Sequence, residues 1–535
     1  MKQIITTEEK LALAGQLQIP LRKATEEAHE FDKGLVGQYN GEFPLTVASA
    51  GHIYYYPLSH KYYECLIDYD GTKIDKPNEN FKELSLTTLN EKFNIHESKK
   101  YGVRFTGSNP TGVRTHAALG MVANVGVDQE EVVNDFDDVP FYNRPVCCGY
   151  HNESGEFLVN AYEGEPGFAR DGSNGEVYYE CTPFYWNGSY EAPIISASEF
   201  GGSMLAPMFD SPDKKVYLPC YWASEVEGKY TSRSGIYPSY GSCNQHMDRS
   251  RKYHTNAHTE TIKAHMTEYI MQLVEFATKD LQSVMMGVCN LTNTAKTSVA
   301  TTDVDYVVVA KDKSLYYTVG QTILLEGSYA NKRTITKIMS HDDINDRLCF
   351  EGQETYTILA EKNISHFAYK TGTTDNIKAS SGSNVSNTDG KHQCKWRGKE
   401  APWADGFSVL CDILKVIEDS FYNIYWLKDP TKYVNGALTE QYVKMDYTVP
   451  KTNGWAKTLG VDPNHPFAAI TKETGASSNT YLSSYYWTGG TTPAVAFVGG
   501  HWYDGRYCSP VSFYVAESPS NSTQYRLARL FVTPV

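Results

Sequence analysis

The residues best suited to recognising another molecule lie near the end of the chain, between His501 and Tyr514. This segment follows the pair Gly499-Gly500, which permits a sharp backbone turn at the end of an apolar run. It then presents histidine, tryptophan, tyrosine, aspartate and arginine side chains in close succession. Tyrosine, tryptophan and arginine provide large contact areas and hydrogen-bonding groups at low entropic cost. The segment therefore predicts a binding surface; the alternative is a tyrosine-rich hairpin of an ordinary β-domain.

Residue patterns that would indicate catalysis are weak. The sequence contains no glycine-rich phosphate loop, no G-x-S-x-G motif and no zinc-ligand spacing. His254 and His258 are four residues apart and could share a helix face as metal ligands, but no third ligand is placed by spacing, and we interpret them as an exposed helix start. Acidic runs at 135–138 and 342–343 leave a glycosidase pair open, although such runs are usually solvated loops. We therefore expect no catalytic residues, no metal site, no cofactor and no enzymatic activity.

Composition restricts the class of protein. A chain of 535 residues exceeds one compact core, so we expect two to four domains. The 40 tyrosines against 21 phenylalanines favour a β-rich protein with interacting surfaces. The net charge of -14 argues against a nucleic-acid partner, which requires a basic surface. The sequence contains no run of about 18 apolar residues, so we expect no membrane span.

The cysteine content and the first residues indicate the compartment. The 11 cysteines form no C-x-x-C pair, which indicates reduced thiols in place of a disulfide framework. The first residues lack the apolar core of a signal peptide, so we expect the chain to fold in a cytoplasm.

The first hundred residues are predicted to form an α+β domain. Residues 1–35 have a helical pattern with Thr7 as a possible cap, and strands are expected over 43–47, 53–56 and 62–67. We interpret this part as an attachment domain that docks on a larger assembly; the alternative is a small domain of no special role.

The remaining chain alternates between strands and one clear helix. Apolar residues at i, i+3, i+4 and i+7 predict a helix over 258–284, capped by Asn256 or Thr259. Five short strands at 306–310, 321–325, 333–338, 348–350 and 356–359 predict a small β-barrel. A linker rich in Ser, Asn and Gly is expected over 379–390. The apolar segment 413–426 fits a strand or a helix.

Several segments together resemble a C-type-lectin-like domain of the formylglycine-generating-enzyme subgroup, as used by phage tail receptor-binding proteins. The most specific are the turn Gly499-Gly500-His501-Trp502 and the closing run Tyr525-Arg526-Leu527-Ala528-Arg529. The opening Tyr-Gly-Val-Arg at 101–104, the aromatic block at 182–186 and the helix text at 271–283 add to them. The resemblance covers roughly residues 100–535. It implies a long helix packed on a twisted sheet, a core aromatic at Trp502, and ligand contacts between the Gly-Gly turn and the closing strand.

One departure from this family bears on chemistry. Relatives that make formylglycine use a pair of reactive cysteines just past the Gly-Gly turn. Here only Cys508 lies in that region, and Asp504 stands roughly where the other cysteine would be. This difference argues against oxidase chemistry and makes Cys508 a small loop residue.

The fold class expected from these features is α+β and β-rich. It comprises an N-terminal attachment domain (1–100), a C-type-lectin-like domain in two parts (101–296 and 379–535) and an inserted small β-module (297–378). The predicted contact residues are Tyr485, Tyr486, Trp487, His501, Trp502, Tyr503, Asp504, Arg506, Tyr507, Ser509, Ser512 and Tyr514. Alternation along strands should bury some of them, Trp502 first.

The function implied by the resemblance is that of a phage tail-tip or tail-fibre protein, made in the bacterial host cytoplasm and located in the virion. Its expected partners are a host-cell surface receptor, either protein or glycan, other tail or baseplate proteins, and further copies in a homotrimer. The residue types between 501 and 512 also fit diversification by a retroelement that mutates adenines. The alternatives are a purely structural virion protein of the baseplate or capsid and, third, a glycan-degrading tailspike.

Overall fold

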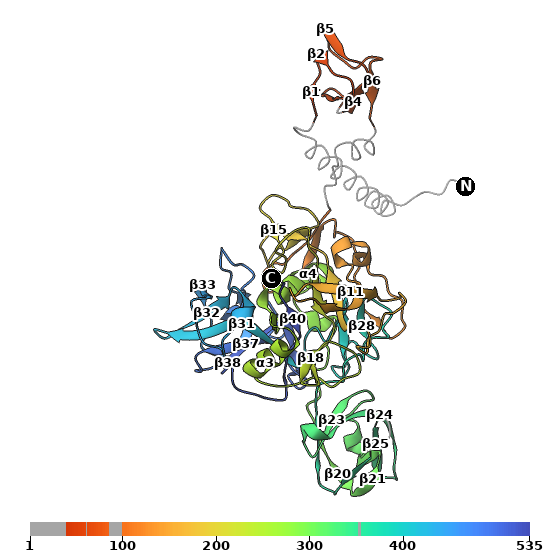
Figure 1. Ribbon diagram of the computed structural model, residues 1–535, viewed down its shortest axis with the longest axis vertical. Helices are drawn as coiled ribbons and strands as arrows, with labels where there is room; N and C mark the ends of the chain where they lie inside the picture. Colours follow the sequence, from red (N-terminus) through yellow and green to blue (C-terminus); the bar gives the residue numbers. More distant parts are fainter. Residues whose placement is uncertain (1–38, 60, 85–98, 351–354, 535) are drawn as a thin grey trace, which may run out of the picture. The chain divides into compact units, whose positions relative to one another are not determined.

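The computed structural model describes residues 39–59, 61–84, 99–350 and 355–534 (Figure 1). The chain divides into two compact units, Met1–Ser98 and Lys99–Val535. The helix predicted over 1–35 and its cap Thr7 lie outside the described residues. Within the described ranges, no helix combines the length and apolarity needed to cross a bilayer.

The described part of the first unit consists of short strands. Phe43, Tyr54, Cys65 and Phe81 belong to its core. The strand predicted over 53–56 is confirmed, whereas the strand expected over 62–67 ends at Cys65. One sheet has the order β1 (Gly41–Glu42), β3 (Ile53–Tyr56), β4 (Lys61–Cys65) and β6 (Phe81–Glu83). A second pair is formed by β2 (Leu45–Ala48) and β5 (Tyr69–Ile74).

The second unit is built on a mixed nine-stranded sheet. Its core strands β31 (Phe407–Glu418), β37 (Ala494–Gly499) and β38 (Ser509–Glu517) are antiparallel and almost fully buried, since both of their faces are covered. The ambiguous segment 413–426 therefore consists of strand on both sides of a turn at Asp419 and Ser420. The sheet continues through β32 (Phe421–Leu427) and β33 (Tyr442–Thr448) on one side, and through β36 (Tyr485–Thr488), β34 (Gly454–Leu459) and β35 (Thr471–Thr474) on the other; β39 (Arg526–Leu527) pairs with β31.

Smaller sheets complete this unit. A five-stranded sheet has the order β15 (Met204–Leu205), β13 (Tyr185–Trp186), β14 (Ile194–Ser196), β7 (Lys100–Arg104) and β8 (Val113–His116). A four-stranded sheet contains β11 (Phe157–Tyr162), β10 (Val146–His151), β12 (Glu176–Cys181) and β16 (Val216–Pro219). Another contains β30 (Lys399–Glu400), β29 (Cys394–Trp396), β28 (Ser381–Ser383) and β9 (Gly126–Val127). Two pairs remain: β17 (Ser224–Val226) with β18 (Lys229–Thr231), and β19 (Ala257–His258) with β40 (Phe531–Val532).

The prediction of a polar linker over 379–390 is wrong, because residues 381–383 form strand β28. Ser381 and Ser383 are fully buried, and β28 pairs in parallel with β9 and antiparallel with β29. Small side chains are suited to this place because the strands approach closely: a Cβ on Gly382 would lie 2.0 Å from the carbonyl oxygen of Gly126. The Ser- and Gly-rich composition thus reflects tight packing.

The predicted helix is present but shorter than expected. Helix α4 spans Ile262–Phe276; Thr261 is its N-cap, and Ala277, in a left-handed conformation, ends it. The caps expected at Asn256 and Thr259 are therefore wrong, because residues 257–258 form β19 instead. His254 is the C-cap of helix α3 (Cys243–Tyr253), so His254 and His258 do not share a helix face.

A closed six-stranded barrel interrupts the second unit (Figure 1). Its strand order is β20 (Ala295–Val299), β22 (Tyr306–Ala310), β25 (Asn345–Phe350), β24 (Lys332–Ser340), β23 (Thr322–Leu325) and β27 (Asn363–His366), and β21 (Thr301–Val304) pairs with β26 (Tyr356–Ile358) beside it. A short helix, α5 (Lys311–Ser314), follows β22. All five predicted strands occur, and the described fold is β-rich α+β. The barrel ends at His366, earlier than the predicted 378, since Phe367 and Ala368 pack with Trp222 and Trp502 of the surrounding domain.

Candidate binding site

The turn between β37 and β38 requires glycine. Gly499 and Gly500 have φ of 106° and 85°, values that residues other than glycine rarely adopt. A Cβ on Gly500 would also lie 2.5 Å from Cys508 Sγ. The turn directs the chain into a loop that contains the short helix η6 (Gly505–Tyr507) and returns at Ser509.

Internal polar contacts hold this loop in shape. The backbone N–H of His501 donates to Asp504 Oδ2 over 3.0 Å. Burial lowers the pKa of His501 to about 3 and raises the pKa of Asp504 to about 7, so the two side chains do not form an ion pair at neutral pH. Arg506 donates to Asp280 Oδ2 over 2.7 Å and to the carbonyl of Ser478 over 3.1 Å. Asp504 and Arg506, both predicted as contacts, thus shape the loop while remaining partly accessible.

The loop and its neighbouring strands present a group of partly exposed aromatic rings, which we call the aromatic surface. Its members are Trp455, Tyr485, Trp487, Tyr503, Tyr507, Tyr514 and Tyr525. Tyr503 and Tyr507 are the most accessible, with 47% and 41% of their surfaces exposed. Partly exposed rings gathered in this way typically mark interaction sites.

One half of the aromatic surface is centred on Tyr507. The centroid of its ring lies 4.4 Å from that of Tyr485, 5.1 Å from Trp455 and 6.0 Å from Trp487. These rings come from three different elements, η6, β36 and β34, which the sheet brings together. They pack tilted or edge-on, as aromatic pairs prefer.

The other half is formed by Tyr503 and Tyr525 around the buried ring of His501. The His501 centroid lies 3.9 Å from Tyr503 and 4.4 Å from Tyr525. The two halves meet over Phe407 of β31, which is buried and lies 5.3 Å from His501, 5.6 Å from Trp487 and 5.5 Å from Tyr514. The aromatic surface is therefore continuous and rests on the central strand of the sheet.

Five of the twelve predicted contact residues are buried in this structure: Tyr486, His501, Trp502, Ser509 and Ser512. Their prediction as surface contacts is therefore corrected. Tyr486 alternates with the accessible Tyr485 and Trp487 along β36. The hydroxyl of Ser509 is hydrogen-bonded to Ser484, and that of Ser512 to the carbonyl of Tyr507. Trp502 is buried, as expected for a residue after the Gly-Gly turn.

Two members of the aromatic surface were not identified from sequence. Trp455 joins it because β34 pairs with β36 in a register that places Trp455 opposite Tyr485. Tyr525 joins it because β39, which follows it, pairs in parallel with β31 beside Phe407. The chain has 40 tyrosines and 8 tryptophans, and only strand register singles these two out.

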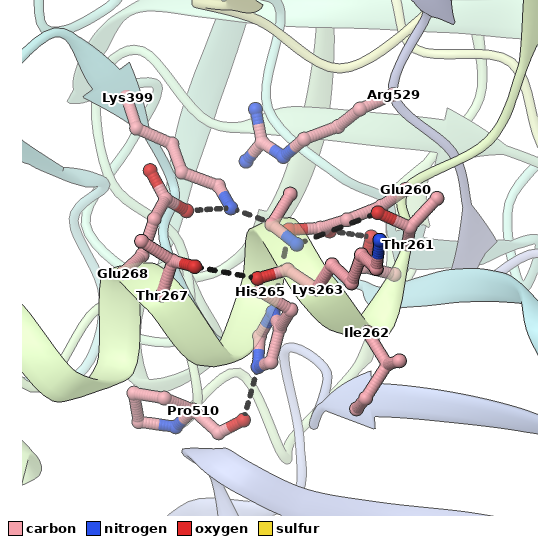
Figure 2. A network of polar contacts seen from close by, with 12 residues as sticks. Glu260, Thr261, Ile262, Lys263, His265, Thr267, Glu268, Lys399, Pro510 and Arg529 are labelled. Carbon is pink, nitrogen blue, oxygen red and sulfur yellow. Dashed lines mark hydrogen bonds and ion pairs between the residues drawn. The ribbon is translucent and has the colours of Figure 1, made fainter. Parts of the chain in front are cut away.

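A network of buried charges connects helix α4 with the start of β38, the strand that follows the loop (Figure 2). Lys399 Nζ lies 2.7 Å from Glu260 Oε1 and 2.6 Å from Glu268 Oε2, and all three side chains are at most 3% exposed. His265, which contacts Glu260 at 3.3 Å, also lies 2.6 Å from the carbonyl oxygen of Pro510. Pro510 belongs to the start of β38, so the network ties α4 to the strand that carries the loop.

The charges in this network are compensated inside the protein. Burial alone would raise the pKa of Glu268, but the ammonium of Lys399 and the guanidinium of Arg144 lower it to about 2. Arg144 Nη1 donates to Glu268 over 2.8 Å and Tyr179 donates over 2.6 Å. Further along α4, the carboxylate of Glu275 accepts hydrogen bonds from the side chains of Arg397 and Trp396. The helix is thus buried on its polar side as well, which its apolar stripe does not indicate.

The closing arginines are structural. Arg529 donates to the carbonyls of Glu400 and Ala401 over 2.5 and 2.7 Å, and its guanidinium lies 4.1 Å from the ring centroid of Trp222. Arg526 lies over Phe497 at 4.7 Å. Each is 1% exposed, so neither is available to a partner at the surface.

Three of the groups considered for catalysis make contacts within the protein. Asp137 pairs with Arg397 at 2.9 Å, and Asp342 accepts from the backbone of Ile344 and Asn345 in a turn of the barrel. Cys508 is buried, which raises the pKa of its thiol, and it interacts with Cys289, a neighbour that the sequence did not reveal. Within the described residues, no group of three or more histidine, cysteine or acidic side chains is arranged to hold a metal.

Comparison of the chain with protein-family models and with curated protein sequences finds no match.

Proposed function

We propose that this chain is a phage tail-tip or tail-fibre protein that binds a host-cell surface receptor through the aromatic surface of a C-terminal lectin-like domain. The observation that carries the proposal is the gathering of seven partly exposed tyrosine and tryptophan rings over a buried frame. Such rings are enriched among the residues that dominate binding energy.

The frame beneath these rings suits a recognition site. Arg506 ties the loop to Asp280 and Ser478, and His265 of α4 contacts Pro510 at the start of β38, so the rings lose little freedom on binding. A helix packed against a mixed sheet, with a Gly-Gly turn before the loop, also agrees with the lectin-like architecture that the resemblance implies. In this proposal the first unit attaches the chain to the tail or baseplate.

Multiple copies would strengthen weak individual contacts. In a homotrimer on a virion, once one site engages a cell, the effective concentration of the others increases, and overall avidity can exceed single-site affinity by about 10²–10⁴. Diversification of the loop by a retroelement is part of the same proposal, since Tyr503 and Tyr507 are its most exposed side chains. Deep sequencing of the gene in a propagated phage population tests it: an invariant loop would remove this part only.

The experiment that tests receptor binding uses the fluorescently labelled full chain and a panel of bacterial strains. We expect binding restricted to certain strains and weaker by at least about 30-fold for the double variant Tyr503→Ala/Tyr507→Ala, because truncation of even one such anchor typically costs about 2 kcal/mol. Tyr150→Ala is the matched control, since Tyr150 lies on β10 and is 51% exposed. Circular dichroism checks that the variants fold.

The outcomes separate the alternatives. Equal binding by the double variant and the control would refute the aromatic surface as the receptor site. Binding to none of the strains, in a chain that assembles into tails, would favour a purely structural virion protein. Release of soluble sugar from the cells would favour a glycan-degrading tailspike.

A further inference from the structure

A cleft of about 420 Å³ lies beside the aromatic surface, where the barrel joins the surrounding domain. Its volume falls in the usual range of small-molecule sites. The lining residues are Leu291, Thr292, Thr294, Ser365, His366, Trp502, Tyr503, Gln524 and Tyr525. Ser365 and His366 belong to barrel strand β27, and Thr292 and Thr294 lead into β20. The barrel therefore forms one wall of the cleft and the loop after the Gly-Gly turn forms the other.

The described residues that line the cleft carry no charge at neutral pH. His366 is the only titratable group among them that could be cationic, and burial lowers its pKa to about 4. Its two ring nitrogens are also occupied, by the side chain of Gln321 and by the carbonyl of Asn293. A charged ligand would therefore find no opposite charge in the lining and would lose hydration without compensation.

Four neutral polar side chains in the lining are available to a ligand. The hydroxyls of Thr292, Thr294 and Ser365 and the amide of Gln524 make no hydrogen bond with the protein in the part of the chain that the structure describes. A hydroxyl both donates and accepts, and an amide offers both kinds of group on one side chain. Such groups match a ligand that itself carries several hydroxyls.

Three aromatic rings form a corner of the same cleft. Tyr503 and Tyr525 have centroids 6.2 Å apart at an interplanar angle of 86°, and Trp502 meets Tyr503 at 6.3 Å and 76°. Nearly perpendicular ring faces can contact the apolar C–H face of a saccharide ring while its hydroxyls reach the opposite, polar wall. Neutral hydroxyls with aromatic faces distinguish this cleft from a site for an ion.

We propose that this cleft binds an uncharged hexose unit of a host-surface glycan, and that the inserted barrel is a working part of the recognition site. This inference rests on the proposed receptor-binding function and names the chemical class of the receptor. The sugar ring lies against Tyr503 and Tyr525, and its hydroxyls exchange hydrogen bonds with Thr294, Ser365 and Gln524.

Titration of the full chain with methyl glycosides tests the cleft directly. The probes are the methyl glycosides of glucose, galactose, mannose and N-acetylglucosamine, with glucuronate and glucosamine as charged counterparts, followed by saturation-transfer NMR and calorimetry. We expect saturable binding of at least one neutral probe and weaker binding of its charged counterpart. Binding of none of the neutral probes, or preference for a charged one, would overturn the inference.

Variants on both walls locate the binding. Thr294→Val and Gln524→Leu should each weaken the bound glycoside about three- to tenfold, the usual effect of losing one neutral hydrogen bond. Thr294 is exposed and Gln524 is partly exposed, so the fold should tolerate both changes. Thr388→Val is the control, since Thr388 is exposed and does not line the cleft. Unchanged affinity in both cleft variants would place the sugar elsewhere and refute the inference.

Mild periodate oxidation of a strain that binds the chain separates this inference from the proposed function. Loss of binding after oxidation of surface sugars supports a glycan receptor. Binding that survives oxidation but is lost in Tyr503→Ala/Tyr507→Ala would overturn the glycan assignment while the receptor-binding function stands. Failure to bind any strain, with glycoside titration intact, would overturn the proposed function and leave the cleft as a sugar site.

Discussion

Replacing Glu268 with glutamine should destabilise the second unit strongly. The carboxylate of Glu268 accepts hydrogen bonds from Arg144, Tyr179 and Lys399 at 2.8, 2.6 and 2.6 Å, and its side chain is 3% exposed. Glutamine has almost the same shape but offers only one accepting oxygen. In either orientation its NH₂ group faces a donor, and the charges of Lys399 and Arg144 lose part of their compensation.

The magnitude follows from the protonation equilibrium of Glu268. Its pKa is about 2 in the folded protein against an ordinary value of 4.5. Each pKa unit between the folded and unfolded states corresponds to about 1.4 kcal/mol, so the ionised group stabilises the fold by roughly 3 kcal/mol at neutral pH. Breaking one partner of a buried ion pair typically costs about 3–5 kcal/mol, which agrees. Because the folded pKa is lowered, this contribution is complete above about pH 5 and is lost as the pH falls towards 2.

Urea denaturation followed by tryptophan fluorescence, at several values between pH 7 and pH 3, measures the effect. Glu268→Gln should lower the free energy of unfolding by about 3 kcal/mol at pH 7, and its deficit against wild type should shrink as the pH falls. The exposed Glu199 offers the control Glu199→Gln, for which we expect a change within about 0.5 kcal/mol. A Glu268→Gln variant as stable as the control at pH 7, or a deficit independent of pH, would refute the reasoning.

Two further predictions concern the loop. Gly500→Ala should destabilise the protein by about 1–3 kcal/mol, since it forces a side chain into a left-handed conformation against Cys508, whereas Gly490→Ala, which has open space around it, should not; equal melting temperatures for the two variants would contradict this. Burial raises the pKa of Asp504 to about 7, so folding favours its protonated form and its contribution weakens as the pH rises from about 4 through 7. Asp504→Asn should therefore match wild type near pH 4 and be more stable by about 1–4 kcal/mol at pH 8, as thermal unfolding across this pH range would show; lower stability of the variant at pH 8 would contradict it.

Local patterns predicted the elements whose signal lies within a few neighbouring residues. The apolar spacing from Ile262 to Phe276 indicated helix α4. The helix begins later than predicted because residues 257–258 pair with β40 as strand β19, and it ends earlier because Ala277 is left-handed. The short apolar runs between 306 and 359 indicated four of the six barrel strands and the neighbouring β26, whereas β20 and β27, which complete the barrel, were not predicted. By contrast, the Ser- and Gly-rich run at 381–383 has the composition of a linker and became a buried strand because β9 and β29 flank it.

The candidate site was predicted in part for the same reason. Local sequence indicated the Gly-Gly turn and the tyrosine-rich loop after it, and the structure shows that Tyr503 and Tyr507 are the exposed rings of that loop. Trp455 and Tyr525 could not be assigned, because their neighbours depend on the pairing of β34 and β39 with strands far along the chain. Nor does any local pattern show that Ser509 and Ser512 turn inward.

The sequence by itself determined a β-rich chain with a tyrosine-rich segment after a glycine turn, since composition and backbone freedom are properties of the residues themselves. Only the tertiary structure decided which rings face outward, which charges are buried, and that the barrel forms a wall of the neighbouring cleft. The physical reason is that exposure and charge compensation depend on partners such as Lys399 and Glu268, which lie 131 residues apart in sequence and 2.6 Å apart in space.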